Sequence, residues 1–290
     1  MHDSMKHHIR ALRPAQWIKS LLVLTAPIAA GEPLATSLVA NLLGAVFAFI
    51  AASSAIYLLN DFMDLSSDRL HPEKKFRPLT SGSISLESAM MLAVGAVVLA
   101  MLLSIFVEGR IYIPLVVYFV LNVSYSLGAK KIPVLELVLV ASGFILRLIA
   151  GSMASGVPVS VWLFIFVGCG ALMVVSGKRL AEKLNCAISI RGVLESYQQS
   201  SLKAAVVMLG VALVSSYVGW LLWGVETTTE TQFVLRLFSL VALVCTVLRY
   251  LVVSSRKIAE SPESLIFGDR TILIATVAWL ICFVSANLVA

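Results

Sequence analysis

Acidic and other charged residues are scarce in this 290-residue chain. It contains five aspartates, and charged residues make up only 13% of the sequence, whereas 59% of the residues are hydrophobic. About a quarter of the residues of an ordinary soluble domain are charged, so this composition excludes a soluble protein and indicates a polytopic membrane protein. Because spanning segments of roughly 20 residues use up the length, we expect one integral membrane domain over residues 1–290.

Cysteine is also rare, and its spacing excludes two kinds of site. The four cysteines lack CxxC spacing, and three of them lie in apolar runs, which predicts neither a disulfide framework nor a zinc site. Basic residues outnumber acidic ones by 22 to 16. They are spread over the loops, which favours membrane orientation and anionic phosphate substrates over nucleic acid as the explanation.

Long apolar runs divide the chain into nine candidate transmembrane helices. The runs at 20–31 and 111–127 are short, and Pro27 interrupts the first of them. We therefore predict an all-α fold, a polytopic membrane helical bundle with about nine transmembrane helices; hydropathy leaves the oligomeric state open, a homo-oligomer included. The nine runs are 20–31, 36–59, 85–107, 111–127, 134–154, 160–176, 202–224, 232–253 and 271–289.

The loop bases gather on one side of the predicted membrane. Seventeen of them fall in the N-terminal segment and in the loops on its side, against Arg110 alone on the other side. Because basic loops stay inside, we expect this side, with the N-terminus, to be cytoplasmic. The Asp-rich stretch that begins at Asn60, the 127–133 loop and the 177–201 loop then emerge on the same face and can build one site.

The stretch from Asn60 to Pro78 concentrates the polar chemistry of the chain. Asp61, Asp64 and Asp68 follow one another at i, i+3 and i+7, which puts them on one face of a helix. Three like charges repel unless a cation lies between them, and Mg²⁺ carried by a phosphorylated substrate is a common solution. A solvated loop that merely ends a helix is the alternative, but the scarcity of acid elsewhere disfavours it.

The motif Asn60-Asp61-x-x-Asp64-x-x-x-Asp68, at the end of the second apolar run, resembles the first Asp-rich motif of the UbiA prenyltransferase superfamily. Members of that superfamily bind a diphosphate through Mg²⁺ with such carboxylates. Further motifs, from about residue 10 to about residue 280, resemble one branch, the decaprenyl-phosphate phosphoribosyltransferases. They are Arg13-Pro14-x-Gln16-Trp17-x-Lys19, Asp68-Arg69-x-His71-Pro72-x-Lys74-x-x-Arg77-Pro78, Gly143-Phe144-x-x-Arg147, Gly177-Lys178-Arg179-x-x-Glu182, and Pro262-Glu263 with Asp269-Arg270.

A second Asp-rich motif, typical of the aromatic prenyltransferases of the superfamily, is missing from the sequence. It would follow a Tyr-Ser and Lys loop; Tyr125-Ser126 and Lys130-Lys131 are present, but the next segment, IPVLELVLVASGF, contains only Glu136 and no second acid one turn on. A donor held by one metal cluster plus bases is therefore favoured over a prenyl diphosphate held between two clusters. 5-Phosphoribosyl diphosphate (PRPP) fits this description, because it carries a diphosphate for the metal and a separate phosphate that needs basic partners.

The resemblance implies a UbiA-like transferase that joins PRPP to a polyprenyl phosphate and releases pyrophosphate. Asp61 and Asp64, with Asn60 and Asp68, would hold Mg²⁺ against the diphosphate and neutralise the charge that grows as it leaves C1. An aromatic prenyltransferase that uses a polyprenyl diphosphate shares the fold and the first motif. A non-catalytic membrane carrier or scaffold that kept the fold is a third alternative.

Basic and aromatic residues of the predicted cytoplasmic loops, together with Glu182, are candidates for substrate binding. Arginine offers a planar fork suited to phosphate oxygens, and lysine a mobile point charge. Ordinary loop charge is the alternative for any single base, although the family motifs favour Lys74, Arg77, Lys178 and Arg179. The candidates are Lys19, Lys74, Arg77, Tyr125, Lys130, Lys131, Lys178, Arg179, Glu182, Arg191 and Tyr197.

Arg147 lies inside an apolar run with no charge nearby in the sequence. A lone guanidinium in a membrane costs several kcal/mol unless it is paired or meets a cavity, so we expect it to face the bundle interior. Ligand contact and a structural pair with Glu136 or an aspartate both satisfy this expectation.

Farther on, Lys178 and Glu182 are spaced i, i+4 and can pair on a helix. For His71, a turn-forming role competes with acid–base work.

Overall fold

The computed structural model describes residues 2–33, 35–184, 192–224, 229–254 and 268–288, and over these residues it contains helices and no strands. The long helices are α3 (Thr36–Met63), α5 (Leu86–Phe106), α6 (Tyr112–Leu127), α7 (Leu135–Ser155), α8 (Val161–Leu184), α9 (Gln199–Gly219), α10 (Glu230–Ser254) and α12 (Arg270–Leu288). The short elements are α1 (His2–Ala11), η1 (Pro14–Leu24), α2 (Thr25–Ala30), α4 (Leu65–Asp68), η2 (Lys74–Phe76), η3 (Ala129–Lys131), η4 (Gly192–Ser196) and the π-helical turn η5 (Trp220–Gly224).

Seven of the described helices are long and apolar enough to cross a membrane: α3, α5, α7, α8, α9 with η5, α10 and α12. Helix α6 is apolar but has only 16 residues. The first apolar run is not one regular helix, because 3₁₀ segment η1 gives way to α2 at Thr25. Pro27 lies in the first turn of α2, where its missing N–H is not needed. The predicted all-helical bundle is confirmed, and the count of nine transmembrane helices is not.

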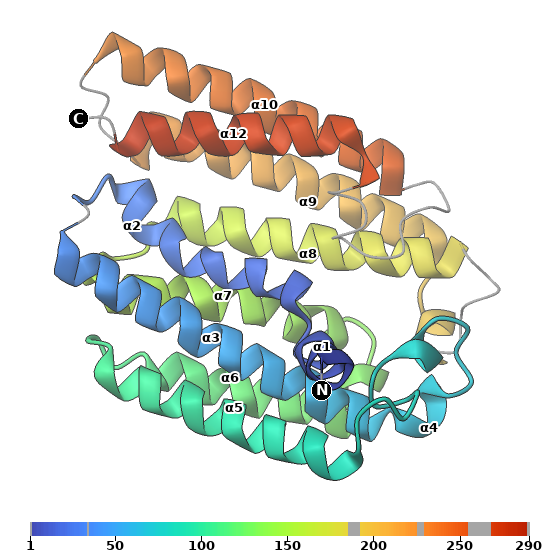
Figure 1. Ribbon diagram of the computed structural model, residues 1–290. Helices are drawn as coiled ribbons and strands as arrows, with labels where there is room; N and C mark the ends of the chain where they lie inside the picture. The colour runs from blue at the N-terminus through green and yellow to red at the C-terminus, as the bar shows by residue number, and fades with distance from the viewer. Residues whose placement is uncertain (1, 34, 185–191, 225–228, 255–267, 289–290) are drawn as a thin grey trace.

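The two largest hydrophobic clusters lie between helices that form the lower and upper halves of the bundle in Figure 1. One core joins α3, α5, α6 and α7 around residues such as Phe49. The other joins α2, α8, α9, α10 and α12 around residues such as Leu213. Helix α7 contributes Leu146 to the first core and Leu148 to the second, so it links the two halves.

Segment η1 packs directly against α7, and a glycine makes this possible. A Cβ atom at Gly151 would lie 1.8 Å from the carbonyl oxygen of Val23, which is fully buried. Protein interiors are close-packed, so a larger residue here must push the two segments apart. The glycine thus fixes how deeply η1 sits in the bundle.

The polar turns lie at one end of the bundle. Helix α3 leads into α4, and the loop after α4 returns to α5, whose first turn is capped by Ser85 accepting a hydrogen bond of 3.1 Å from the N–H of Ser88. Figure 1 shows α1 and α4 close to this end, whereas the C-terminal end of α12 lies at the opposite end. Turns η3 and η4 contact each other, and together with α4 they frame the site described next.

Candidate functional site

A cavity of about 720 Å³ opens beside α4. Its walls come from four regions that are far apart in the sequence: Arg13 directly before η1, the end of α3 with α4 and the following loop, the α6–η3 region, and α8 with η4. The lining residues are Arg13, Tyr57, Asn60, Asp64, Ser67, Asp68, His71, Glu73, Lys74, Arg77, Tyr125, Lys130, Lys131, Lys178, Glu182, Gly192, Val193 and Leu194. The fold therefore brings the three predicted loops to one site.

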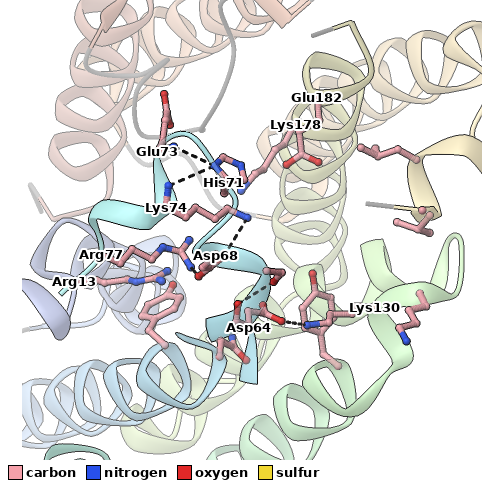
Figure 2. A pocket seen from close by; sticks show the side chains of 18 residues that line it. Arg13, Asp64, Asp68, His71, Glu73, Lys74, Arg77, Lys130, Lys178 and Glu182 are labelled. Carbon is pink, nitrogen blue, oxygen red and sulfur yellow. Dashed lines mark hydrogen bonds and ion pairs between the residues drawn. The ribbon is translucent and has the colours of Figure 1, made fainter. Parts of the chain in front are cut away.

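The three aspartates do not form one carboxylate face. Helix α3 ends at Met63, and Asp64, with φ −94° and ψ 7°, separates it from α4. Asp61 and Asp68 both accept hydrogen bonds from Arg77 Nη1, at 3.0 and 2.5 Å. Asp64 instead accepts from Lys130 Nζ at 2.5 Å (Figure 2). The predicted single face is wrong, and the described ranges contain no group of three or more His, Cys, Asp or Glu side chains placed to hold a metal ion.

Asp61 lies behind the cavity wall. It is 2% exposed and does not belong to the lining residues. Its Oδ1 atom accepts hydrogen bonds from Arg13 and Arg77, and the guanidinium of Arg13 also lies 4.8 Å from the centroid of the Tyr57 ring. Asp61 is therefore neutralised from two sides and anchors two guanidinium groups at the cavity.

The cavity carries an excess of positive charge. Six of its lining side chains are basic and four are acidic. Lys74 Nζ lies 3.9 Å from Asp68 Oδ1, while Lys130 and Lys131 come from η3 and Lys178 projects from α8 (Figure 2). Bases on several walls suit a ligand with more than one anionic group.

Oxygen atoms of the kind that Mg²⁺ prefers lie on the α3–α4 wall. Asn60, Asp64 and Asp68 all line the cavity, and the Asn60 side-chain oxygen accepts a hydrogen bond from the Ser126 hydroxyl. The basic partners of the two aspartates, Arg77 and Lys130, are about a quarter exposed. Because these long side chains can turn toward a phosphate, the donor set fits a divalent cation that arrives with an anionic substrate.

His71 shapes the loop after α4. Its Nδ1 atom accepts hydrogen bonds from the backbone N–H groups of Glu73, at 3.2 Å, and Lys74, at 3.4 Å (Figure 2). Burial, with a further contribution from the charge of Lys74, lowers the pKa of His71. The neutral ring can therefore accept both bonds, which favours the turn-forming role over acid–base work.

Glu136, the one acid in the segment directly after the Lys loop, forms a buried ion pair. It is fully buried and accepts two hydrogen bonds from Arg179, Nε to Oε1 at 2.6 Å and Nη2 to Oε2 at 2.8 Å. Arg179 also donates to Glu182 at 2.7 Å, a contact that the prediction of a Lys178–Glu182 pair did not include. The Tyr197 hydroxyl lies 3.4 Å from Glu136 Oε1. Arg179 and Tyr197 were predicted to contact substrate, but neither lines the described cavity.

Arg147 is held inside the bundle by aromatic rings. It is 3% exposed, donates to the carbonyl oxygen of Gly143 at 2.7 Å, and lies over the rings of Phe49 and Tyr118. The pair with Glu136, one of the alternatives expected for Arg147, is wrong, because the two residues are about three turns apart on α7 and Glu136 pairs with Arg179. Arg147 does not line the described cavity.

Arg13 is the main site residue that the sequence prediction missed. The prediction placed the base of its motif at Lys19, which donates to Gln16 at 2.5 Å and does not line the described cavity. Arg13 has a left-handed backbone, with φ 56°, directly before η1, and its guanidinium reaches Asp61 from there. The motif Arg13-Pro14-x-Gln16-Trp17-x-Lys19 contains both bases, so the sequence already offered Arg13 as a candidate. Arg191, another predicted base, lies outside the described residues.

Residues 20–268 match the model of the UbiA prenyltransferase family. The chain belongs to this family. It is 34% identical over 287 residues to the decaprenyl-phosphate phosphoribosyltransferase of Corynebacterium glutamicum, covering 96% of this chain and 86% of the relative. It is 33% identical over 283 residues to the enzyme of the same name from Mycobacterium tuberculosis, covering 94% and 91%.

Solved structures confirm the UbiA fold. A UbiA homolog from Archaeoglobus fulgidus, bound to DMAPP and Mg²⁺, superposes with a TM-score of 0.69 at 16% identity, covering 98% of this chain and 99% of that one. The apo structure of a UbiA homolog from Aeropyrum pernix gives 0.60 at 14% identity, covering 98% and 97%. With its apolar helices, this family member is an integral membrane protein of a transferase family.

Proposed function

We propose that this protein transfers the 5-phosphoribosyl group of PRPP to a polyprenyl phosphate and releases pyrophosphate. The observation that carries the proposal is the asymmetry of the cavity. Its α3–α4 wall bears Asn60, Asp64 and Asp68, and its η3 and α8 walls bear Lys130, Lys131 and Lys178. The acid in the segment after the Lys loop, Glu136, is paired with Arg179. Near full-length similarity to proteins named decaprenyl-phosphate phosphoribosyltransferase supports the same activity.

The donor diphosphate would bind at the α3–α4 wall. Asn60, Asp64 and Asp68 would hold Mg²⁺, which when bound neutralises charge on the departing diphosphate. Asp61 was predicted, together with Asp64, to be a principal metal ligand; its burial behind two guanidinium groups favours instead a role in presenting Arg77 to the phosphates. Lys130, already paired with Asp64, would turn to a phosphate oxygen when the metal arrives.

The acceptor needs little activation from the protein. A phosphate oxygen of the lipid attacks C1 of the ribose, the bond from C1 to the diphosphate oxygen breaks, and the diphosphate leaves with the electron pair. No proton has to be removed, because the lipid phosphate is anionic at neutral pH. His71, whose Nδ1 is occupied by backbone N–H groups, is therefore not required as a base. In-line attack predicts inversion at C1.

The cavity would open to the cytoplasm, as the one-sided distribution of loop bases supports. A soluble, highly charged donor then reaches it from the cytosol. The lipid acceptor would approach from the bilayer, with its phosphate at the membrane surface and its chain among the apolar helices.

The decisive experiment offers purified protein two substrate pairs in the presence of Mg²⁺. One contains PRPP labelled in the ribose with decaprenyl phosphate, and the other a labelled prenyl diphosphate with hydroxybenzoate. We expect label to enter the lipid fraction from PRPP and no prenylated ring to form. Product from the second pair alone would establish the aromatic prenyltransferase alternative, and no product from either would favour the carrier alternative.

A further inference from the structure

The loop that carries Lys130 and Lys131 ends in a strained turn. Val134 has φ 65° and ψ −48°, and the N–H of Leu135 donates to the carbonyl oxygen of Pro133 at 2.7 Å. Val134 is thus the centre of a γ-turn of the rare, left-handed kind. β-Branched residues seldom adopt this backbone conformation, which persists only where the surroundings hold it. The Val134 side chain is 61% exposed, so its own packing does not explain the conformation.

The hydroxyl group of Tyr197 holds this turn. It accepts a hydrogen bond of 2.8 Å from the N–H of Val134 and donates one of 3.4 Å to Glu136 Oε1. Burial raises the pKa of Tyr197, so the hydroxyl stays protonated and can make both bonds. Tyr197 is 9% exposed and is not among the residues found to line the cavity, which argues against direct contact with a substrate.

One hydroxyl therefore joins two walls of the cavity. Lys130 and Lys131 lie in η3, directly before the strained turn, and they line the cavity. On the other side, Tyr197 directly follows η4. Leu194 of η4 also lines the cavity, and its carbonyl oxygen accepts a hydrogen bond of 2.7 Å from Lys183. Behind the hydroxyl, Glu136 is immobilised by its ion pair.

We propose that Tyr197 is a positioning residue: its hydroxyl holds Val134 in the strained turn that presents Lys130 and Lys131 to the phosphate groups of the substrate. The inference rests on the proposed function, since the phosphate groups are those of PRPP. It replaces the direct ligand contact that the sequence predicted for Tyr197.

The first test compares Tyr197→Phe with a matched control. The variant keeps the ring and loses the bond to Val134, so we expect the KM for PRPP to rise about tenfold with kcat within about twofold, as when binding is lost equally in ground and transition states. The control is Tyr217→Phe, which loses a buried hydroxyl contact of 2.6 Å with Ser239 in the core formed by α9, α10 and α12 and should keep the KM.

The second test is a rescue at the turn itself. Glycine adopts a positive φ without steric cost, whereas alanine does not. In the Tyr197→Phe background, Val134→Gly should bring the KM back to within about threefold of wild type, and Val134→Ala should not. Because Val134 is exposed, neither change opens a cavity in the core.

Each outcome is decisive. A wild-type KM in Tyr197→Phe overturns the positioning role. A lower kcat at unchanged KM also overturns it, because that result means only that less of the protein is folded and active. If Val134→Gly does not restore the KM, the Tyr197 hydroxyl contacts the substrate directly and the positioning role is wrong. If Val134→Ala restores the KM equally well, strain at Val134 is not the cause. Equilibrium binding of labelled inorganic pyrophosphate with Mg²⁺ to the same proteins separates the hypotheses. If Tyr197→Phe binds pyrophosphate more weakly than wild type and Val134→Gly restores the affinity, but no protein turns over PRPP, only the proposed function is refuted. If all the proteins bind pyrophosphate equally well, the positioning role is refuted.

Discussion

Removing one member of the buried Glu136–Arg179 pair should destabilise the bundle strongly. Glu136 is fully buried, Arg179 is 3% exposed, and two hydrogen bonds of 2.6 and 2.8 Å join them. Arg179→Met leaves an unpaired carboxylate in the interior, and breaking such a pair costs about 3–5 kcal/mol. The double variant Glu136→Met with Arg179→Met removes both charges and should recover much of this loss, since isosteric apolar replacement is often close to neutral.

Thermal unfolding in detergent, followed by tryptophan fluorescence, measures both effects. At about 2–4 °C per kcal/mol, Arg179→Met should lower the Tm by roughly 6–20 °C, and the double variant by clearly less. Asp269→Asn is the matched control. It weakens a more exposed pair with Arg249, but asparagine can still accept from the N–H groups of Thr271 and Ile272 at the start of α12, so the Tm should change little.

Two results would refute this reasoning. Strictly additive losses in the double variant would mean that the two side chains do not stabilise each other. A Glu136→Gln variant with the Tm of wild type and a raised Mg²⁺ requirement would instead make Glu136 a metal ligand, in the manner of a second acidic motif.

Three further predictions follow from the site and the packing. Asp64→Asn should lower kcat/KM for PRPP by about 100-fold or more at unchanged Tm, because a metal-binding carboxylate is lost; wild-type activity would exclude Asp64 from the metal site. Gly151→Ala should cost about 1–3 kcal/mol in unfolding experiments, since its Cβ would lie 1.8 Å from Val23 O, whereas Gly95→Ala meets nothing within 4 Å and should be neutral or slightly stabilising. Because the pKa of His71 is lowered in the fold, the unfolded chain binds the proton first, and stability should fall as the pH drops below about 6.5; a Tm series from pH 8 to 5 should be flatter for His71→Asn, and an equal slope would contradict this.

The membrane fold could be predicted from the sequence because hydropathy is a local property. Every predicted apolar run overlaps a helical segment, and the family motif around Asp64 pointed to the UbiA fold that the comparisons confirm. The number of spans was not predictable in the same way. A run shows that a segment is apolar, but not that η1 is a 3₁₀ segment or that α6 has only 16 residues.

The amino-acid sequence by itself predicted that the Asp-rich stretch and the basic loops around Lys130 and Lys178 can share one site, because the basic residues are concentrated in alternate loops between the apolar runs. It did not determine which charges meet. The hydrogen bonds from Arg13 to Asp61 and from the Val134 N–H to the Tyr197 hydroxyl join residues 48 and 63 positions apart. Such pairs depend on how each helix is rotated and how deeply it packs, and only the tertiary structure decides that.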